Sequence, residues 1–167
     1  AVGGTWFENR YPGCGVDTPN HFYSFAYEPN HEWSHFFAKR DELWQYFERV
    51  ADKYGLRKHI AFKTEVTEAE FDEANALWRV TARNSDGALE THIARILVSA
   101  VGILNRPRLP DIPGRDSFKG PAFHTAEWDK DFDWRGKRVA LIGTGASGHQ
   151  VGPTIQPDVE RLMIFQR

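Results

Sequence analysis

The stretch Val139-Ala-Leu-Ile-Gly-Thr-Gly-Ala-Ser-Gly148 decides the fold. It places a GxGxxG pattern directly after a run of strand-forming residues and before a segment of helical length. In that context Gly143 allows a tight turn, Gly145 lets a diphosphate approach the backbone, and Gly148 lets helix and strand pack closely. The N–H groups of the helix N-terminus would face the phosphates. A glycine turn of purely structural use is the alternative. The residues expected to line a dinucleotide site are Gly143, Thr144, Gly145, Ala146, Ser147 and Gly148.

The second strand of this nucleotide fold indicates which nicotinamide cofactor is preferred. Residues 161–165 form a second apolar run, and Gln166 and Arg167 follow it. An NAD site usually has an acidic residue here, which binds the ribose 2'-hydroxyl. A guanidinium would instead pair with a 2'-phosphate, so Arg167 favours NADPH over NADH. A solvated arginine at a strand end is the alternative interpretation.

The sequence pattern of the first hundred residues predicts, in order, a loop region, a helix and a small antiparallel meander. Residues 1–38 are rich in Gly, Pro, Asn, His and aromatic residues and lack sustained periodicity, which predicts a structured loop region. Apolar residues between Asp41 and Tyr54 recur at helical spacing, and Gly55 marks the expected end of that helix. The β-forming runs that predict the meander are residues 60–66, 77–82 and 89–93, with a turn at 84–87.

The next segment predicts a buried strand and then a linker. Residues 96–102 form a continuous apolar run that ends in glycine, as is typical of a buried strand whose end approaches a ligand or helix. Residues 105–114 contain three prolines and a closing glycine, which prevents regular structure. Residues 137–142 predict the strand of the glycine turn. Pro153 lies within the helix that should follow, and we expect it to kink or shorten that helix.

Composition excludes several classes of function. The formal net charge is -2 and the pI is about 6.4, so the chain lacks the basic footprint of a protein that binds nucleic acid or an anionic membrane. Cys14 is the single cysteine, which excludes an internal disulfide and a thiolate zinc site, and we expect no metal centre. No run approaches the roughly eighteen apolar residues of a membrane span. We expect a cytoplasmic protein that acts on a small molecule, in an oligomeric state that the sequence leaves open.

The most specific motif precedes the glycine turn. Residues 118–129 read Phe-Lys-Gly-Pro-Ala-Phe-His-Thr-Ala-Glu-Trp-Asp. This stretch resembles the fingerprint of the Baeyer-Villiger flavin monooxygenases, FxGxxxHxxxW followed by Pro or Asp. The resemblance implies a hinge that links a flavin domain to an NADPH domain and couples their motion. By residue type alone, His124 would be a hydrogen-bonded interior histidine and Trp128 a core anchor. The fixed positions are Phe118, Gly120, His124, Trp128 and Asp129.

The N-terminal loop extends this resemblance. Residues 3–13 are similar to the family's segment beneath the flavin ring, and Asp17 matches an aspartate beside the flavin and the nicotinamide. The resemblance implies that Asp17 acts in catalysis by orienting an arginine, which is expected beyond Arg167. By residue type, Asp17 would cap a turn within residues 15–19. The positions implied for FAD are Gly4, Thr5, Trp6, Asn9, Asp17, Tyr23 and Val66.

Two further stretches refine the resemblance. Residues 13–19 are similar to those of members that oxidise aryl ketones, such as hydroxyacetophenone monooxygenases. At residues 99–102 the family usually has Ala-Ser/Thr-Gly, and this chain has Val101 where the hydroxyl residue would stand. A hydroxyl contact at that position is therefore in doubt.

The resemblance implies an α/β fold of two dinucleotide-binding domains, of which this chain would be an internal fragment. We expect residues 1–104 to form part of an FAD-binding domain that carries the small meander. Residues 105–133 would form the linker with the fingerprint, and residues 134–167 would begin a Rossmann-like NADP-binding domain. The glycine motif for the FAD pyrophosphate is expected before Ala1.

The function implied by the resemblance is ketone oxygenation. Members of the family use FAD, NADPH and O2 to insert an oxygen atom next to a ketone carbonyl, which yields an ester or a lactone. The cofactors supply this chemistry, while the protein positions them and excludes water. Two alternatives stay open. An N- or S-oxygenating flavin monooxygenase would usually have Tyr or Phe in place of Trp128, and a non-catalytic NADP-binding module would have no use for the long N-terminal loop.

The expectation of a fragment has a direct test. Residues 1–167 expressed alone should neither hold FAD tightly nor oxidise NADPH with a ketone, because the FAD glycine motif and the catalytic arginine are expected outside them. The flavin absorbance of the purified chain and its NADPH oxidation measure this. A yellow, active preparation of these residues alone would contradict the expectation.

Overall fold

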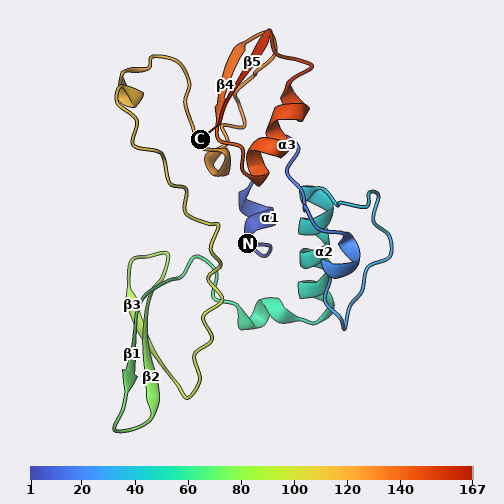
Figure 1. The fold of residues 1–167 in the computed structure, drawn as a ribbon. Coiled ribbons are helices and arrows are strands. Elements are labelled where there is room, and N and C mark those ends of the chain that lie inside the picture. The colour runs from blue at the N-terminus through green and yellow to red at the C-terminus, as the bar shows by residue number, and fades with distance from the viewer. Residues whose placement is uncertain (167) are drawn as a thin grey trace. The chain divides into compact units, whose positions relative to one another are not determined.

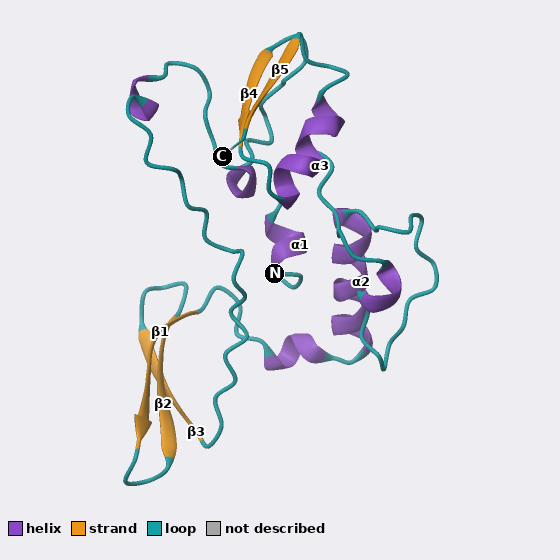
Figure 2. Ribbon diagram, viewed as in Figure 1, coloured by secondary structure: helices purple, strands orange, loops and turns teal. Residues whose placement is uncertain are grey.

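The computed structural model describes residues 1–166 and divides into two compact units (Figure 1). One unit comprises residues 1–54 together with the residues from 103 onward, and the other comprises residues 55–102. Figure 2 shows helices and a parallel strand pair in the first unit and an antiparallel sheet in the second. The mixed α/β class expected from the sequence is confirmed.

Short elements separated by long loops make up the first unit. Its regular elements are α1 (Thr5–Glu8), α2 (Arg40–Lys53), β4 (Arg138–Ile142), α3 (Ala146–Ile155) and β5 (Arg161–Phe165), with 3-10 turns at Asn20–Phe22, Arg115–Ser117 and Thr125–Glu127. The second unit has a 3-10 turn at Leu56–His59 and the strands β1 (Glu65–Asp72), β2 (Leu77–Arg83) and β3 (Leu89–Ala94).

Helix α2 forms where the apolar periodicity predicts it. Leu43, Tyr46 and Val50 recur at intervals of three and four residues and are buried on one face. Acidic residues lie in the first turn and Lys53 in the last, in the sense that the helix dipole favours. Gly55 adopts the left-handed conformation (φ 60°) directly after the helix, so the expected glycine stop is confirmed.

Strands β4 and β5 pair side by side in parallel, and helix α3 connects them in a β-α-β unit (Figure 1). Arg138 pairs with Arg161 at one end of the ladder and Ile142 with Phe165 at the other. Parallel strands need a crossover connection, and α3 provides it. Pro153 lies inside α3, which ends two residues later at Ile155. The β-turn-α-β order expected around the glycine motif is thus present.

The core of the first unit joins the N-terminal loop to α2 and α3. Val151 and Ile155 of α3, each 1% exposed, belong to the same buried cluster as Leu43 of α2. Apolar burial is the dominant favourable term in folding, so this cluster holds the loop and both helices together. The other members of the cluster are Trp6, Tyr11, Cys14, Val16 and Ala38.

The second unit is the expected antiparallel meander, but its first strand lies at other residues than predicted. The order β1-β2-β3 is as expected, but β1 spans Glu65–Asp72 rather than residues 60–66. Its ladder with β2 runs from Glu65 opposite Arg83 to Asp72 opposite Leu77, with a bulge after Val66. The expectation was wrong because backbone pairing, not apolar composition, sets a strand's limits, and most side chains of β1 are exposed and polar.

Two further expectations need correction. Residues 96–102 form no strand, and Ile96 and Val98 are 79% and 78% exposed. A strand needs a ladder partner, and none of residues 1–166 pairs with this run. Residues 1–38 are mostly loop, as expected, but α1 and the turn at Asn20–Phe22 lie within them.

Across residues 1–166, no helix is both long enough and apolar enough to cross a membrane. The longest helix, α2, has 14 residues and carries charges along much of its length.

Leu43 offers a test of the shared core. Its side chain is 0% exposed, so Leu43→Ala in the intact protein should lower the free energy of unfolding by about 2–5 kcal/mol. Gln45→Ala on the exposed side of the same helix is the matched control and should stay within about 0.5 kcal/mol of the parent. Urea denaturation followed by tryptophan fluorescence measures both. Equal stabilities of the two variants would contradict this account of the core.

Candidate functional site

The glycine turn between β4 and α3 leaves space for an anion. Gly143 has a φ of +102°, which favours glycine, and a Cβ on Gly143 or Gly145 would meet no atom within 4 Å. A Cβ on Gly148 would lie 2.7 Å from the carbonyl oxygen of Gly143. Gly143 therefore adopts a turn conformation, Gly145 leaves open space beside the backbone, and Gly148 packs closely against the Gly143 carbonyl.

Helix α3 begins at Ala146 beside this open space, with Gly145 as its N-cap. No side chain caps the helix, and the first N–H groups of a helix have no intrahelical partners. They are available to an anion, which the helix dipole also favours. The residues present at the turn therefore fit the diphosphate of a dinucleotide.

A hollow of about 390 Å³ adjoins the turn. Three of its lining residues are apolar side chains of the strands: Leu141 of β4 and Leu162 and Ile164 of β5. A hollow with apolar lining and a few polar groups is typical of small-molecule sites. The remaining lining residues are Gly143, Thr144, Gly148, His149, Gly152, Pro153 and Gln156.

Ser147 of the turn bonds to the N-terminal loop rather than to its own helix. Its hydroxyl donates to the Tyr11 hydroxyl oxygen at 3.3 Å, and the Tyr11 hydroxyl donates to Gln150 Oε1 at 2.9 Å. Burial is the main cause that raises the pKa of Tyr11 to about 12, so its phenol stays protonated at neutral pH and remains a donor. The structure thus links the glycine turn to the loop by side-chain hydrogen bonds.

Within the loop, four of the positions implied for FAD form two pairs. Trp6 Nε1 donates to the Tyr23 hydroxyl at 3.2 Å, and the two rings meet edge to face at 5.5 Å between centroids. Asn9 is buried, and its Nδ2 donates to the carbonyl oxygen of Thr5 at 3.1 Å. Gly4 has a φ of +48° and a Cβ there would meet no atom within 4 Å. Trp6 is 8% exposed and acts as a core anchor within these residues.

Asp17 follows a segment whose backbone is bonded to residues 38–40. Val16 N–H donates to the Ala38 carbonyl at 3.0 Å, and Gly15 forms an antiparallel bridge with Lys39. The Asp17 side chain itself is exposed. The loop therefore presents this carboxylate to its surroundings on an anchored backbone.

Several fixed residues of the fingerprint segment contact their neighbours. A Cβ on Gly120 would lie 2.6 Å from the exposed Phe118 ring, so the ring lies close over the Gly120 backbone. His124 Nδ1 accepts from the Ala126 N–H at 3.1 Å, which caps the turn at Thr125–Glu127 and places the ring proton on Nε2. The interpretation of His124 as a hydrogen-bonded histidine fits this contact.

Trp128 and Asp129 complete the fingerprint. The Trp128 ring meets Phe123 edge to face at 5.1 Å and Trp134 at 5.9 Å, and it packs against the buried cluster. Asp129 Oδ1 accepts from the Asp131 N–H at 3.0 Å. The segment is therefore held by ring packing and turn caps rather than by a strand or long helix.

Two of the expected site residues do not belong to the described part of the first unit. Val66 lies in the second unit and is 60% exposed. Arg167 lies outside the described residues, so the expected pairing with a 2'-phosphate stays a prediction. Within residues 1–166 no group of three or more His, Cys, Asp or Glu side chains could hold a metal ion.

Sequence reasoning missed Gln150 and Arg40. Gln150 lies two residues beyond the GxGxxG pattern, at a helix position that no motif singled out. Arg40 Nη2 donates to the Phe7 carbonyl at 2.9 Å, and its guanidinium lies 4.7 Å from the centre of the Trp44 ring. The Gln150–Tyr11 and Arg40–Phe7 contacts have no local sequence signal, because each joins segments that are distant along the chain.

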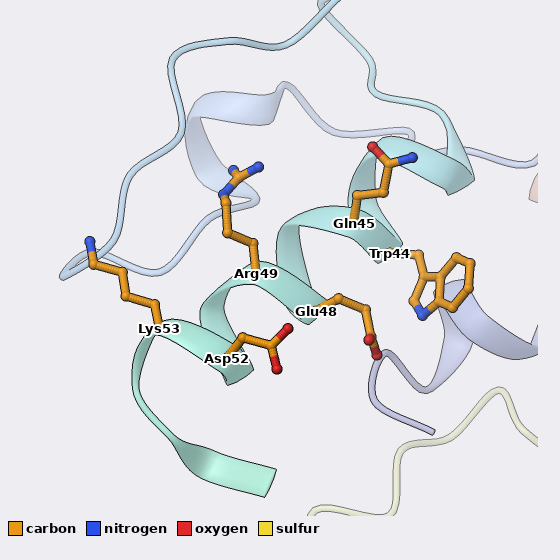
Figure 3. Close-up of a pocket in the computed structure, with 6 residues that line it drawn as sticks. All are labelled: Trp44, Gln45, Glu48, Arg49, Asp52 and Lys53. Carbon is orange, nitrogen blue, oxygen red and sulfur yellow. The ribbon is translucent and has the colours of Figure 1, made fainter.

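A larger hollow of about 610 Å³ lies on the surface of α2, and none of the expected site residues lines it (Figure 3). All six lining side chains come from that one helix, and four of them carry charge. A ligand site normally gathers groups from several elements, so this hollow is not the candidate site. The lining residues are Trp44, Gln45, Glu48, Arg49, Asp52 and Lys53.

Together, the glycine turn, the open helix N-terminus and the adjoining hollow form a β-α-β unit of the kind found in dinucleotide-binding domains, packed on an aromatic loop. The chain matches the family model described as FMO-like, flavin-binding monooxygenase-like, over residues 16–167. It therefore belongs to the flavin-binding monooxygenase-like family.

Curated relatives are similar over the whole chain. A Baeyer-Villiger monooxygenase of Streptomyces coelicolor is 48% identical over 168 residues, which is 100% of this chain and 31% of the relative. A Baeyer-Villiger monooxygenase of Pseudomonas aeruginosa is 42% identical over 166 residues, which is 99% of this chain and 31% of the relative. The resemblance inferred from the fingerprint is confirmed.

Solved structures agree. OTEMO in complex with FAD and NADP superposes with a TM-score of 0.87 at 43% identity, covering 100% of this chain and 33% of that one. An ε-caprolactone-bound cyclohexanone monooxygenase gives 0.86 at 39% identity, covering 98% of this chain and 32% of that one. The chain thus spans about a third of the length of the relatives it matches.

Gly148 and Gly145 give a matched test of the turn. In the intact protein, Gly148→Ala should lower the free energy of unfolding by about 1–2 kcal/mol, because the new methyl group meets a backbone carbonyl. That clash should outweigh the gain of up to about 1 kcal/mol that alanine brings to a helix. Gly145→Ala has open space and an extended φ of -73°, so its stability should match the parent. Thermal unfolding distinguishes the two, and the opposite order would sink the assigned roles.

Proposed function

We propose that the intact protein carrying this chain is an FAD- and NADPH-dependent Baeyer-Villiger monooxygenase. Its substrates would be O2 and a small-molecule ketone, with aryl ketones as the first class to test, and its product an ester or lactone. The observation that carries the proposal is the joining of an open glycine turn, the complete fingerprint and the Asp17 loop within one packed unit. Supporting it, relatives named Baeyer-Villiger monooxygenase are up to 48% identical over the whole chain.

The NADP part of the site would be formed by the turn. The diphosphate would lie against the N–H groups at the start of α3, where Gly145 leaves room and the helix dipole favours negative charge. Arg167 would bind the 2'-phosphate. The residues proposed for NADP are Gly143, Thr144, Gly145, Ala146, Ser147, Gly148 and Arg167.

The FAD part would be formed by the N-terminal loop. Gly4, with its positive φ and open surroundings, would let the ring system approach the backbone. Asp17 would carry the catalytic role by orienting an arginine of the intact protein, and its exposed position on an anchored backbone supports that role. The other residues proposed for FAD are Thr5, Trp6, Asn9, Tyr23 and Val66.

The fingerprint would serve as the hinge between the two cofactor domains. The ring contacts of Trp128 and the His124 cap make this segment rigid without a regular element, which suits a part that moves as one piece. We propose the domain limits 1–104, 105–133 and 134–167. A cytoplasmic location belongs to the same proposal and is supported by the free, buried Cys14, which suits a reducing compartment.

The test is a product assay on the intact protein. Purified protein should hold a flavin and oxidise NADPH in step with an added ketone, and one atom of isotopically labelled O2 should appear in the ester, as detected by mass spectrometry. Gly145→Ala should remain folded yet raise the KM for NADPH by roughly tenfold, because the methyl group occupies the place of the diphosphate. Conversion of amines or sulfides in place of ketones would point to the N- or S-oxygenating class. Absence of any bound flavin after reconstitution would leave only a nucleotide-binding module and overturn the proposal.

A further inference from the structure

The side chain of Gln150 pairs with the backbone of the N-terminal loop as a strand would. Its Nε2 donates to the Gly15 carbonyl at 2.9 Å, while its Oε1 accepts from the Gly15 N–H at 3.3 Å. The same oxygen accepts from the Tyr11 hydroxyl at 2.9 Å. Both lone pairs of Oε1 are therefore used, and the carboxamide is fixed in orientation by one donor and two acceptor contacts.

Glycines in the loop make this approach possible. A Cβ on Gly13 would lie 2.5 Å from the Gln150 carbonyl oxygen and would also meet Thr154 Oγ1. A Cβ on Gly15 would lie 2.7 Å from the Ala38 carbonyl oxygen on its other side. Gly13 is thus confined by helix α3 and Gly15 by residue 38, and no residue larger than glycine fits at either position without a shift.

The pairing connects the two halves of the proposed site. Ser147, in the glycine turn, bonds to Tyr11, and Gln150 lies one helical turn further along the same face of α3. On the loop side, Gly15 precedes Asp17 by two residues, and the intervening Val16 is tied to Ala38. A displacement of α3 relative to the loop would have to break these bonds.

We infer that Gln150 is a positioning residue: by pairing with Gly15 and Tyr11, it holds the loop that carries Asp17 in register with the helix of the glycine turn. This inference rests on the proposed function, because its consequence is the alignment of the nicotinamide with the flavin. Gln150 acts through Gly15 and Tyr11, so its loss should disturb alignment more than nucleotide affinity.

Amide hydrogen exchange tests the inference without turnover. In the intact holoprotein, Gln150→Ala should speed exchange in residues 11–17 by about tenfold or more, because the Gly15 N–H loses its acceptor and the loop its anchor. Residues 138–142 of β4 serve as the internal reference and should be unchanged. Gln45→Ala, the same substitution on the exposed face of α2, is the control. Unchanged exchange in residues 11–17 would overturn the inference.

Anaerobic flavin reduction by NADPH is the second measurement. At saturating NADPH, the rate constant for flavin reduction in Gln150→Ala should be roughly 10- to 100-fold lower than in the parent, as expected for a misalignment of about an ångström. Its Kd for NADP⁺ should change by less than about threefold. A loss of affinity with an unchanged reduction rate per bound flavin is what a merely structural role would give, and it would overturn the inference.

Two conservative variants keep the test open if Gln150→Ala fails to fold. Tyr11→Phe keeps the buried ring but removes the hydroxyl that bridges Ser147 and Gln150. Gln150→Glu keeps the Oε acceptor but removes the donor to the Gly15 carbonyl. Both should slow flavin reduction in the same direction but by less, and parent rates in both would overturn the inference. A parent protein whose flavin NADPH does not reduce would instead refute the proposed function, while the exchange measurement would still report on the pairing.

Discussion

Close backbone packing of residues 13–15 against helix α3 is the constraint on which the first unit depends. Glycine at position 13 lets the loop approach helix α3, glycine at position 15 lets it approach residue 38 on the other side, and Val151 and Ile155 of α3 are buried in the same cluster as Cys14. The same helix begins at the glycine turn, so its N-terminus and its packed face belong to one element. Helix α3 would therefore fix the position of a nucleotide at the turn relative to a flavin at the loop.

The aromatic content of the chain stabilises segments that have little regular structure. Trp6 and Tyr23 brace the loop, while Trp128 and its neighbouring rings brace the fingerprint. Aromatic side chains bury large areas with few rotatable bonds, and edge-to-face pairs favour particular orientations. In these long loops, ring packing thus stabilises the backbone that strand ladders and helical hydrogen bonds stabilise elsewhere. This gives a physical basis for the fixed Trp128 of the fingerprint, whose ring contacts Phe123 and Trp134.

The family relationship and the structure explain different aspects of the site. Identity of 48% to a Baeyer-Villiger monooxygenase accounts for the order of motifs along the chain. The contacts give physical reasons for two of those residue types: Gly148 clears the Gly143 carbonyl, and His124 caps a turn through Nδ1. Asp17 differs from these residues, because no contact among residues 1–166 explains it. Its backbone segment is anchored and its carboxylate is exposed, and its proposed role depends on groups of the intact protein.

The sequence by itself determined the local elements whose signals are contained in a few neighbouring residues. Helix α2, the glycine turn with its β-α-β unit, and the fingerprint were predictable because helical period, glycine spacing and a fixed motif need no distant partner. The limits of β1 and the irregular state of residues 96–102 were not predictable, because a strand exists only where another backbone pairs with it. Only the tertiary structure decided that Gln150 meets Gly15 and Tyr11. Those residues are separated by some 135 positions or more, and their contact arises from the close approach of two segments that no local pattern encodes.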